Sequence, residues 1–277
     1  MKKLIRNIAV FTFLFITMVF HAMSVLSQPP AVFKKSSVIN GPFIDFTVDL
    51  LGNLYVITPQ SNLKKIDING DSVANYNNVR LFGKPSSVNV TNPLKILLYF
   101  QPYATLVVLD RFLNKRNTID LRKQNIFTVK AVSPSYDNNI WVFDEQDNKL
   151  KKVADDGSTL SETLDFRMIF DSVPSPVSII DRDGFVYLYD PEKGIYVFDY
   201  YGAFKSKLMF LKWKDFEVIG KNIYGFDDTH YFVYRTGTLD LKQYPLPLAF
   251  KEYSSLKLGN EKVYILKNDQ VEIYSLQ

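Results

Sequence analysis

The sequence predicts an all-β fold, a six-bladed β-propeller made of four-stranded antiparallel blades. A short apolar pattern, usually with an aromatic residue after the first aliphatic one, occurs six times, at Leu54, Ile96, Ile140, Val186, Ile223 and Val263. Successive copies lie 42, 44, 46, 37 and 40 residues apart, and a period of about 40 to 45 residues is typical of propeller blades. The copies are β-branched and aromatic runs bounded by Asn, Asp, Gly and Pro, a pattern that indicates strands.

The fourth copy predicts a complete blade. Its four expected strands span residues 177–180, 185–189, 195–199 and 203–210, and Asp-Gly and Tyr-Gly pairs mark the tight turns between them. These residues resemble the NHL-type repeats of six-bladed propellers, in which an Asp-x-x-Gly turn precedes an apolar strand that ends in Asp. The resemblance extends from Val38 to the end of the chain and implies the fold, not a chemistry. The second and fifth copies depart from it, with Pro93-Leu94 in place of the glycine turn and Gly225 inside a strand.

The last blade lacks one strand in sequence order. Only two strands, at residues 263–266 and 271–275, follow the start of the sixth copy. Residues 31–39 precede the first blade and are expected to supply the missing outer strand. The ring would then be closed by an N-terminal strand in the last blade, which removes open sheet edges.

The N-terminus has the order of a secretory signal peptide. Lys2, Lys3 and Arg6 precede an apolar run from Ile8 to Phe20, which is shorter than the roughly 20 residues of a membrane-spanning helix. We expect residues 1–27 to be a signal peptide and residues 28–277 to be a single propeller domain. Retention of the segment as an anchor is the alternative, and no transmembrane span is expected after cleavage.

Net charge and cysteine content limit the possible partners and the expected location of the protein. The chain carries a net charge of +4, of which three charges belong to the signal segment, and it has no cysteine. A nearly neutral domain without a basic stripe argues against a nucleic-acid partner. A domain of this size folds without disulfides, and the composition is similar to that of Bacteroidetes proteins. We therefore expect an exported protein of the periplasm or outer-membrane periphery, or an extracellular one.

The sequence offers little for catalysis. His230 is the single histidine after residue 27, and no nucleophile elbow, zinc motif or phosphate loop is present. A ring of Glu, Asn and Asp at the inner strands would indicate a lactonase-like calcium site, but the expected inner-strand starts are Phe43, Lys84, Lys130, Pro176, Asp215 and Tyr253. We expect no catalytic residues, no metal ligands and no cofactor, with calcium as the one ion that the loop carboxylates would suit.

Candidate binding residues fall in loops. Asp144, Asp190 and Asp227 follow the second strand of three successive blades, so they would share one face. They either converge on a Ca²⁺ ion or a polyol, or cap their own turns. Asp228 and His230 complete the densest polar cluster, in the loop of the fifth blade.

Loop tyrosines are the other candidates. Tyr103 and the pair Tyr200-Tyr201 are expected in loops or at strand ends, where tyrosine is typical of interfaces. The sequence thus favours a non-catalytic propeller that binds a protein partner in a cell-envelope complex. A metal-dependent lactonase- or esterase-like hydrolase and a glycan-binding module are the alternatives.

Overall fold

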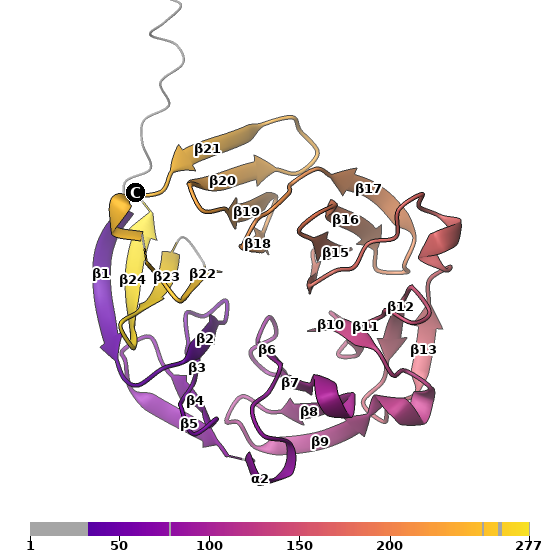
Figure 1. Cartoon of the computed structure of the whole chain (residues 1–277), viewed down its shortest axis with the longest axis horizontal. Coiled ribbons are helices and arrows are strands. Elements are labelled where there is room, and N and C mark those ends of the chain that lie inside the picture. Colours follow the sequence, from indigo (N-terminus) through magenta and orange to yellow (C-terminus); the bar gives the residue numbers. More distant parts are fainter. Residues whose placement is uncertain (1–32, 78, 251, 260–261, 277) are drawn as a thin grey trace, which may run out of the picture. The chain divides into compact units, whose positions relative to one another are not determined.

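The computed structural model describes residues 33–77, 79–250, 252–259 and 262–276. These residues form six four-stranded sheets, in which all paired strands are antiparallel, arranged as blades around a ring (Figure 1). The predicted all-β fold and its six blades are confirmed. The expected signal peptide lies outside the described residues. Within those residues, no helix is long and apolar enough to span a membrane.

The strands of each blade follow one another from the centre of the ring to its rim. Blade 1 contains β2 (Asp45–Val48), β3 (Leu54–Ile57), β4 (Leu63–Ile66) and β5 (Ser72–Tyr76); blade 2 contains β6 (Ser87–Asn89), β7 (Ile96–Phe100), β8 (Thr105–Leu109) and β9 (Lys115–Asp120); blade 3 contains β10 (Val129–Pro134), β11 (Ile140–Asp144), β12 (Lys149–Val153) and β13 (Thr159–Glu162). Blade 4 contains β14 (Ser178–Arg182), β15 (Phe185–Asp190), β16 (Gly194–Asp199) and β17 (Phe204–Leu208); blade 5 contains β18 (Asp215–Ile219), β19 (Asn222–Phe226), β20 (His230–Arg235) and β21 (Leu241–Pro245); blade 6 contains β22 (Ser255–Gly259), β23 (Lys262–Lys267), β24 (Gln270–Leu276) and β1 (Phe33–Asn40).

Short helices interrupt some of the connections. One α-helical turn, α2 (Val79–Phe82), precedes blade 2. The 3₁₀ helices are η1 (Gln101–Tyr103), η2 (Leu121–Gln124), η3 (Phe166–Met168) and η4 (Leu248–Phe250).

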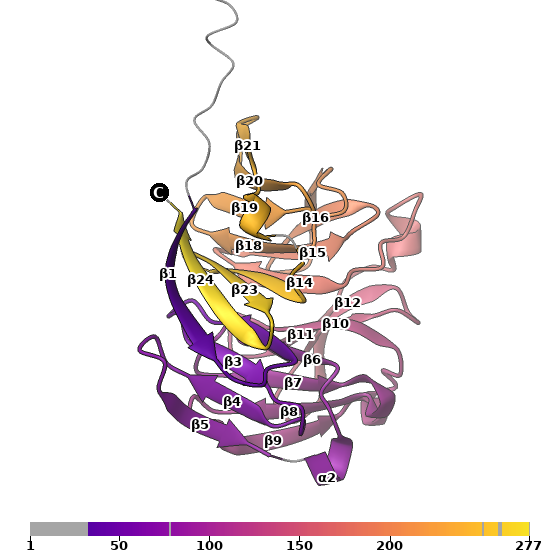
Figure 2. The ribbon, with the colours of Figure 1, turned by 60° about the vertical axis from the view of Figure 1, so that its left-hand side comes forward.

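An N-terminal strand closes the ring, as predicted. β1 pairs with β24 in sheet A, with Val38 opposite Glu272 and Asn40 opposite Gln270. Figure 2 shows the two strands side by side along the blade. The strand ends at Asn40, one residue later than the sequence predicts, and residues 31 and 32 of the predicted strand lie outside the described residues.

The antiparallel order gives the ring two different faces. The turns between first and second strands and between third and fourth strands lie on one face, here called the turn face, which contains residues 49–53, 67–71, 90–95, 110–114, 135–139, 154–158, 183–184, 200–203, 220–221 and 236–240. The remaining hairpin turns, such as residues 145–148 and 191–193, and the connections between blades form the connection face. Neighbouring blades are bonded together near this face: Lys65 of β4 donates to the Arg111 carbonyl in a turn of blade 2, and Lys95 of blade 2 donates to the Asn138 carbonyl in a turn of blade 3.

Burial explains why the second strands dominate the sequence pattern. Every residue of β3, β7 and β11 is buried, because each blade is covered on both sides by its neighbours and both strand faces must be apolar. Gly225, the irregular residue of blade 5, lies against the ring of Trp213, and a Cβ atom there would overlap that ring. The glycine therefore makes room for a tryptophan of the preceding connection.

Candidate functional site

The inner strands line a polar channel. In β18 and β22 buried apolar residues alternate with half-buried polar ones, so one strand face packs between blades and the other faces the ring centre. A cavity of 130 Å³ there is lined by Thr47, Asn89, Ser178, Asp215, Glu217 and Lys257, among others. The predicted inner-strand starts were wrong except at Asp215: the strands begin at Asp45, Ser87, Val129, Ser178, Asp215 and Ser255. The connections between blades vary in length, so the position of one inner strand does not fix the next.

Four charged side chains form two loose ion pairs between neighbouring blades beside the channel. Lys257 Nζ lies 3.5 Å from Asp215 Oδ2, and Arg182 Nη2 lies 3.8 Å from Glu217 Oε1. Blade 5 thus presents two acids from one strand, each facing a cation on a neighbouring blade. Burial raises the pKa of Asp215, and it raises the pKa of Glu217 to about 7 in spite of the nearby Arg182. Desolvation therefore outweighs the attraction of the guanidinium.

Glu217 gives the first testable prediction. The pKa of Glu217 in the folded state lies above the ordinary value of 4.5, so the folded state binds this proton more tightly than the unfolded state does. The stability that the proton contributes is fully present below about pH 4.5 and is lost as the pH rises through about 7. Glu217→Gln keeps the neutral form at all pH values. We expect the variant to match the wild type at about pH 4 and to exceed its free energy of unfolding by about 1–3 kcal/mol at pH 8. Urea denaturation at both pH values measures this difference, and a gap that does not change with pH would contradict the prediction.

A second, larger hollow opens at the turn face. It has a volume of 320 Å³ and is lined by residues from turns and strand ends of blades 1 to 4, including Leu50, Pro93, Pro134, Tyr136, Asp181 and Arg182. Leu50 and the two prolines supply apolar walls. Asp181 and Arg182, the last two residues of β14, add two charged side chains to the lining. This combination of apolar walls and a few fixed polar groups is typical of binding sites.

Asp181 is the most buried charged residue of this hollow. Its Oδ2 atom accepts hydrogen bonds from Trp141 Nε1 at 2.7 Å, from Ser135 Oγ at 3.1 Å and from the Tyr136 amide at 3.2 Å. These bonds join blade 3 to blade 4. Its Oδ1 atom is buried without a hydrogen-bond partner, as are Nε and Nη2 of Arg182, and unsatisfied buried groups of this kind indicate a site that a ligand or water completes.

Three tyrosines form the rim beside the hollow. The Tyr136 and Tyr200 rings meet edge to face at 5.3 Å, and the Tyr200 and Tyr201 rings lie 4.0 Å apart. Lys152 Nζ lies over the rings of both Tyr136 and Trp141, at 5.5 Å and 4.5 Å from their centroids, and it is paired with Asp137 at 2.9 Å. The expected placement of Tyr200 and Tyr201 at a strand end and turn is confirmed.

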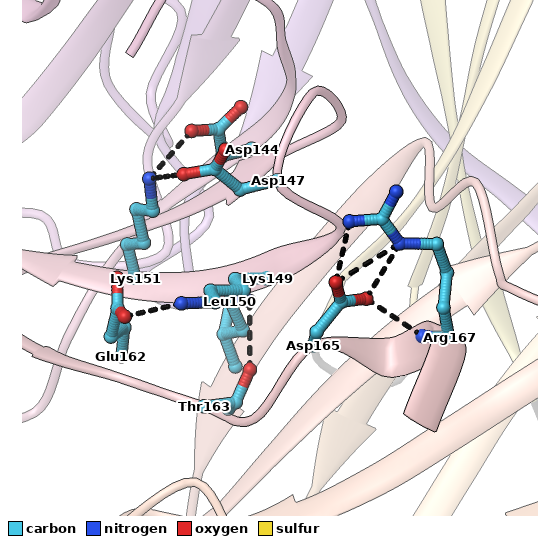
Figure 3. Close-up of polar contacts among 9 residues, drawn as sticks. All are labelled: Asp144, Asp147, Lys149, Leu150, Lys151, Glu162, Thr163, Asp165 and Arg167. Atoms are coloured by element: carbon cyan, nitrogen blue, oxygen red, sulfur yellow. Dashed lines mark hydrogen bonds and ion pairs between the residues drawn. The ribbon is translucent and has the colours of Figure 1, made fainter. Parts of the chain in front are cut away.

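The three aspartates predicted to share a face do lie on one face, the connection face, but in separate turns. Each accepts a backbone N–H two residues further on: Asp144 from Gln146, Asp190 from Glu192 and Asp227 from Thr229. Asp144 also binds Lys151 of its own blade, and Figure 3 shows this amine between Asp144 and Asp147. Each aspartate therefore caps its own turn, and no contact joins the three to one another.

The remaining predicted residues lie in two places. The turn between β19 and β20 brings together Asp227, Asp228 and His230. Asp227 Oδ1 accepts a hydrogen bond from the His230 amide, and Asp228 Oδ1 lies 3.3 Å from Lys214 Nζ. Tyr103 lies in η1 of blade 2 against Phe82. Within the described residues, no group of three or more His, Cys, Asp or Glu side chains is placed to hold a metal ion. Whether any of these residues binds a ligand stays a prediction.

Comparisons with known proteins give the fold a context. No family model and no curated protein matches this sequence. Among solved structures, it is similar to virginiamycin B lyase from Staphylococcus aureus (TM-score 0.58, 12% identity, 89% of this chain and 100% of that one) and to the Neurospora crassa Pan2 WD40 domain (TM-score 0.60, 8% identity, 90% and 96%). It is also similar to BBS1N in complex with ARL6DN (TM-score 0.51, 11% identity, 90% and 98%).

The chain has the fold of a six-bladed β-propeller. At these identities the similarity shows the fold alone, because unrelated functions share this architecture. The candidate site of this propeller must therefore be argued from its own residues. Sequence reasoning missed Glu217, Lys257 and Asp181, although the alternation of polar and apolar residues in Asp215–Ile219 and Ser255–Gly259 is visible in the sequence.

Proposed function

We propose that this chain is a non-catalytic binding propeller that holds a protein partner on its turn face. The hollow of 320 Å³ carries the proposal, because it places apolar walls and incompletely bonded polar groups on a frame of blades that are bonded to one another. Loops on a rigid scaffold are the usual location of binding residues. Two smaller cavities, of 130 Å³ and 200 Å³, lie along the inner strands and share Thr47, Val88 and Lys257 in their lining.

The surface around the hollow supports a macromolecular partner. Leu51, Leu94, Tyr136 and Tyr201 are between 63% and 77% exposed on the turn face. Exposed apolar and aromatic residues that surround a hollow are typical of protein interaction sites. One structure of similar fold is described in complex with another protein, which supports the same use of the architecture by analogy.

We extend the proposal to location. The apolar run of residues 8–20 behind three basic residues supports export, so the propeller would act in the periplasm, at the outer-membrane periphery or outside the cell. A partner in the cell envelope follows from this location.

Affinity purification of the full-length protein from an envelope fraction after mild crosslinking tests the interaction. Leu94→Asp places a charge on the turn face, and Met168→Asp places one on a still more exposed residue of η3, on the connection face. We expect mass spectrometry to find one stoichiometric partner, whose recovery falls about 10-fold or more with Leu94→Asp and is unchanged with Met168→Asp. Equal recovery with both variants would contradict the use of the turn face.

The same sample separates the alternatives. No partner together with one calcium ion per chain would overturn the proposal in favour of a metal-dependent lactonase- or esterase-like hydrolase. Absence of a protein partner with retention on a polysaccharide column, lost when Tyr201 is replaced by alanine, would favour a glycan-binding propeller.

A further inference from the structure

The charges around the turn-face hollow do not balance. Arg182, which lines the hollow, lies 3.8 Å from Glu217, and Lys152, at the rim beside the hollow, lies 2.9 Å from Asp137 Oδ2. Two acids that line the hollow, Asp181 and Asp183, have no cationic partner within the described part of the chain. The hollow therefore contains negative charge that no side chain of the propeller compensates.

The two acids occupy different depths. Asp181 is 8% exposed, with its three hydrogen-bond donors all on one oxygen and the other oxygen unpartnered. Asp183 is exposed at the tip of the β14–β15 turn. A buried carboxylate in a site of low polarity attracts a cation more strongly than one in water, and the exposed carboxylate offers direct hydrogen-bond acceptors.

We propose that the hollow receives a basic side chain, lysine or arginine, of the protein partner. Its charged end would pair with Asp183 and lie in the field of Asp181, and its aliphatic stem would pack against Pro93, Pro134 and Tyr136. Long basic side chains bind in this way, with the stem on apolar surface and the charge on a polar group. This inference rests on the proposed function, because it names the chemistry of the partner at the same face.

The aromatic rim is already able to hold a cation. Lys152 of this chain lies over Tyr136 and Trp141, with its amine 4.5 Å from the Trp141 centroid. The exposed ring of Tyr201 lies in the same cluster through Tyr200. A cation over an exposed aromatic face is stabilised, so the ring of Tyr201, which Lys152 does not cover, adds to the preference that the acids create.

Trp141 provides a direct measurement. The chain has two tryptophans; the Trp141 indole N–H donates to Asp181, and Trp213 lies in the connection between β17 and β18 on the connection face. In a ¹H–¹⁵N spectrum of the full-length protein, titration with N-acetyl-arginine amide at pH 8 is expected to shift the Trp141 indole signal in a saturable manner. Trp213 is expected not to move. At this pH Glu217 is ionised and compensates Arg182.

Matched probes and variants test whether the charge of the bound side chain, rather than its stem, is responsible for binding. N-acetyl-norleucine amide has a similar stem without charge, and N-acetyl-glutamate amide has the opposite charge; both are expected to shift Trp141 much less. Asp183→Asn is expected to weaken arginine-amide binding about 3-fold or more, whereas Asp71→Asn, an exposed acid of the turn face outside the hollow, is expected to leave it unchanged. Equal shifts with all three probes, or no effect of Asp183→Asn, would overturn the inference.

The two proposals fail separately. If Leu94→Asp abolishes partner recovery but the hollow shows no preference for the arginine probe, the turn face remains the proposed interface. Only the inference that a basic side chain binds in the hollow is then overturned. Specific arginine binding without any recovered partner would keep the site chemistry and overturn the protein-interaction role.

Discussion

Removal of β1 is expected to destabilise the whole ring rather than one blade. β1 pairs with β24 along its length, and Lys35 Nζ lies 2.6 Å from Glu272 of that strand. Phe33 also packs edge to face on Tyr231 and Phe250, so the strand holds residues of blades 5 and 6 together. A chain that begins at Gly41 would leave β24 as an open edge, which favours aggregation.

The comparison is between residues 33–277 and residues 41–277. We expect the shorter chain to melt about 10 °C or more below the longer one, since about 1 kcal/mol shifts the melting temperature of a domain of this size by about 2–4 °C. Thermal unfolding followed by circular dichroism measures it. Addition of a peptide of residues 33–40 is expected to restore part of the loss by re-forming the pair with β24. Identical melting of the two chains would show that β1 does not stabilise the ring.

The fold was predictable because its strongest signal comes from strands with no solvent-facing side. The second strands at Leu54, Ile96 and Ile140 must be apolar on both faces, so each blade repeats the same short run. The closing strand followed from the count of strands after Val263. Neither argument needs information about side-chain contacts.

The candidate site was much harder to predict. Asp215 and Glu217 alternate with apolar residues as they would in a strand that faces solvent, so the sequence pattern does not distinguish a channel from a surface. The contact between Arg182 and Glu217, and the bond from Trp141 to Asp181, join separate blades. Such contacts depend on how neighbouring blades are rotated relative to each other. No short sequence motif in the connections specifies this rotation.

For the loop aspartates, the sequence predicted the positions but not the role of the carboxylates. Asp144, Asp190 and Asp227 were correctly placed at equivalent positions, yet each satisfies its own turn. Asp-rich turns have the same composition whether the carboxylate binds a ligand or the backbone. The geometry of the acceptor, and not its residue type, separates the two cases.

Asp144 leads to the second large effect, because its partner is buried with it. The Lys151 side chain is 7% exposed and the Asp144 side chain 1% exposed, and the two charges are 2.7 Å apart (Figure 3). Lys151→Met would leave the Asp144 charge buried with the Gln146 amide as its remaining donor. Loss of one partner of a buried ion pair costs about 3–5 kcal/mol of stability, and urea denaturation is expected to show a decrease of that size.

The same strand provides the matched control. Lys149 pairs with Glu162 at the surface, where both side chains are more exposed, so Lys149→Met is expected to cost less than about 1 kcal/mol. The double variant Asp144→Asn with Lys151→Met removes both charges and is expected to recover most of the stability that Lys151→Met loses. If Lys151→Met cost no more than Lys149→Met, the buried pair would not stabilise blade 3, and Asp144 would again be open to a role in ligand binding.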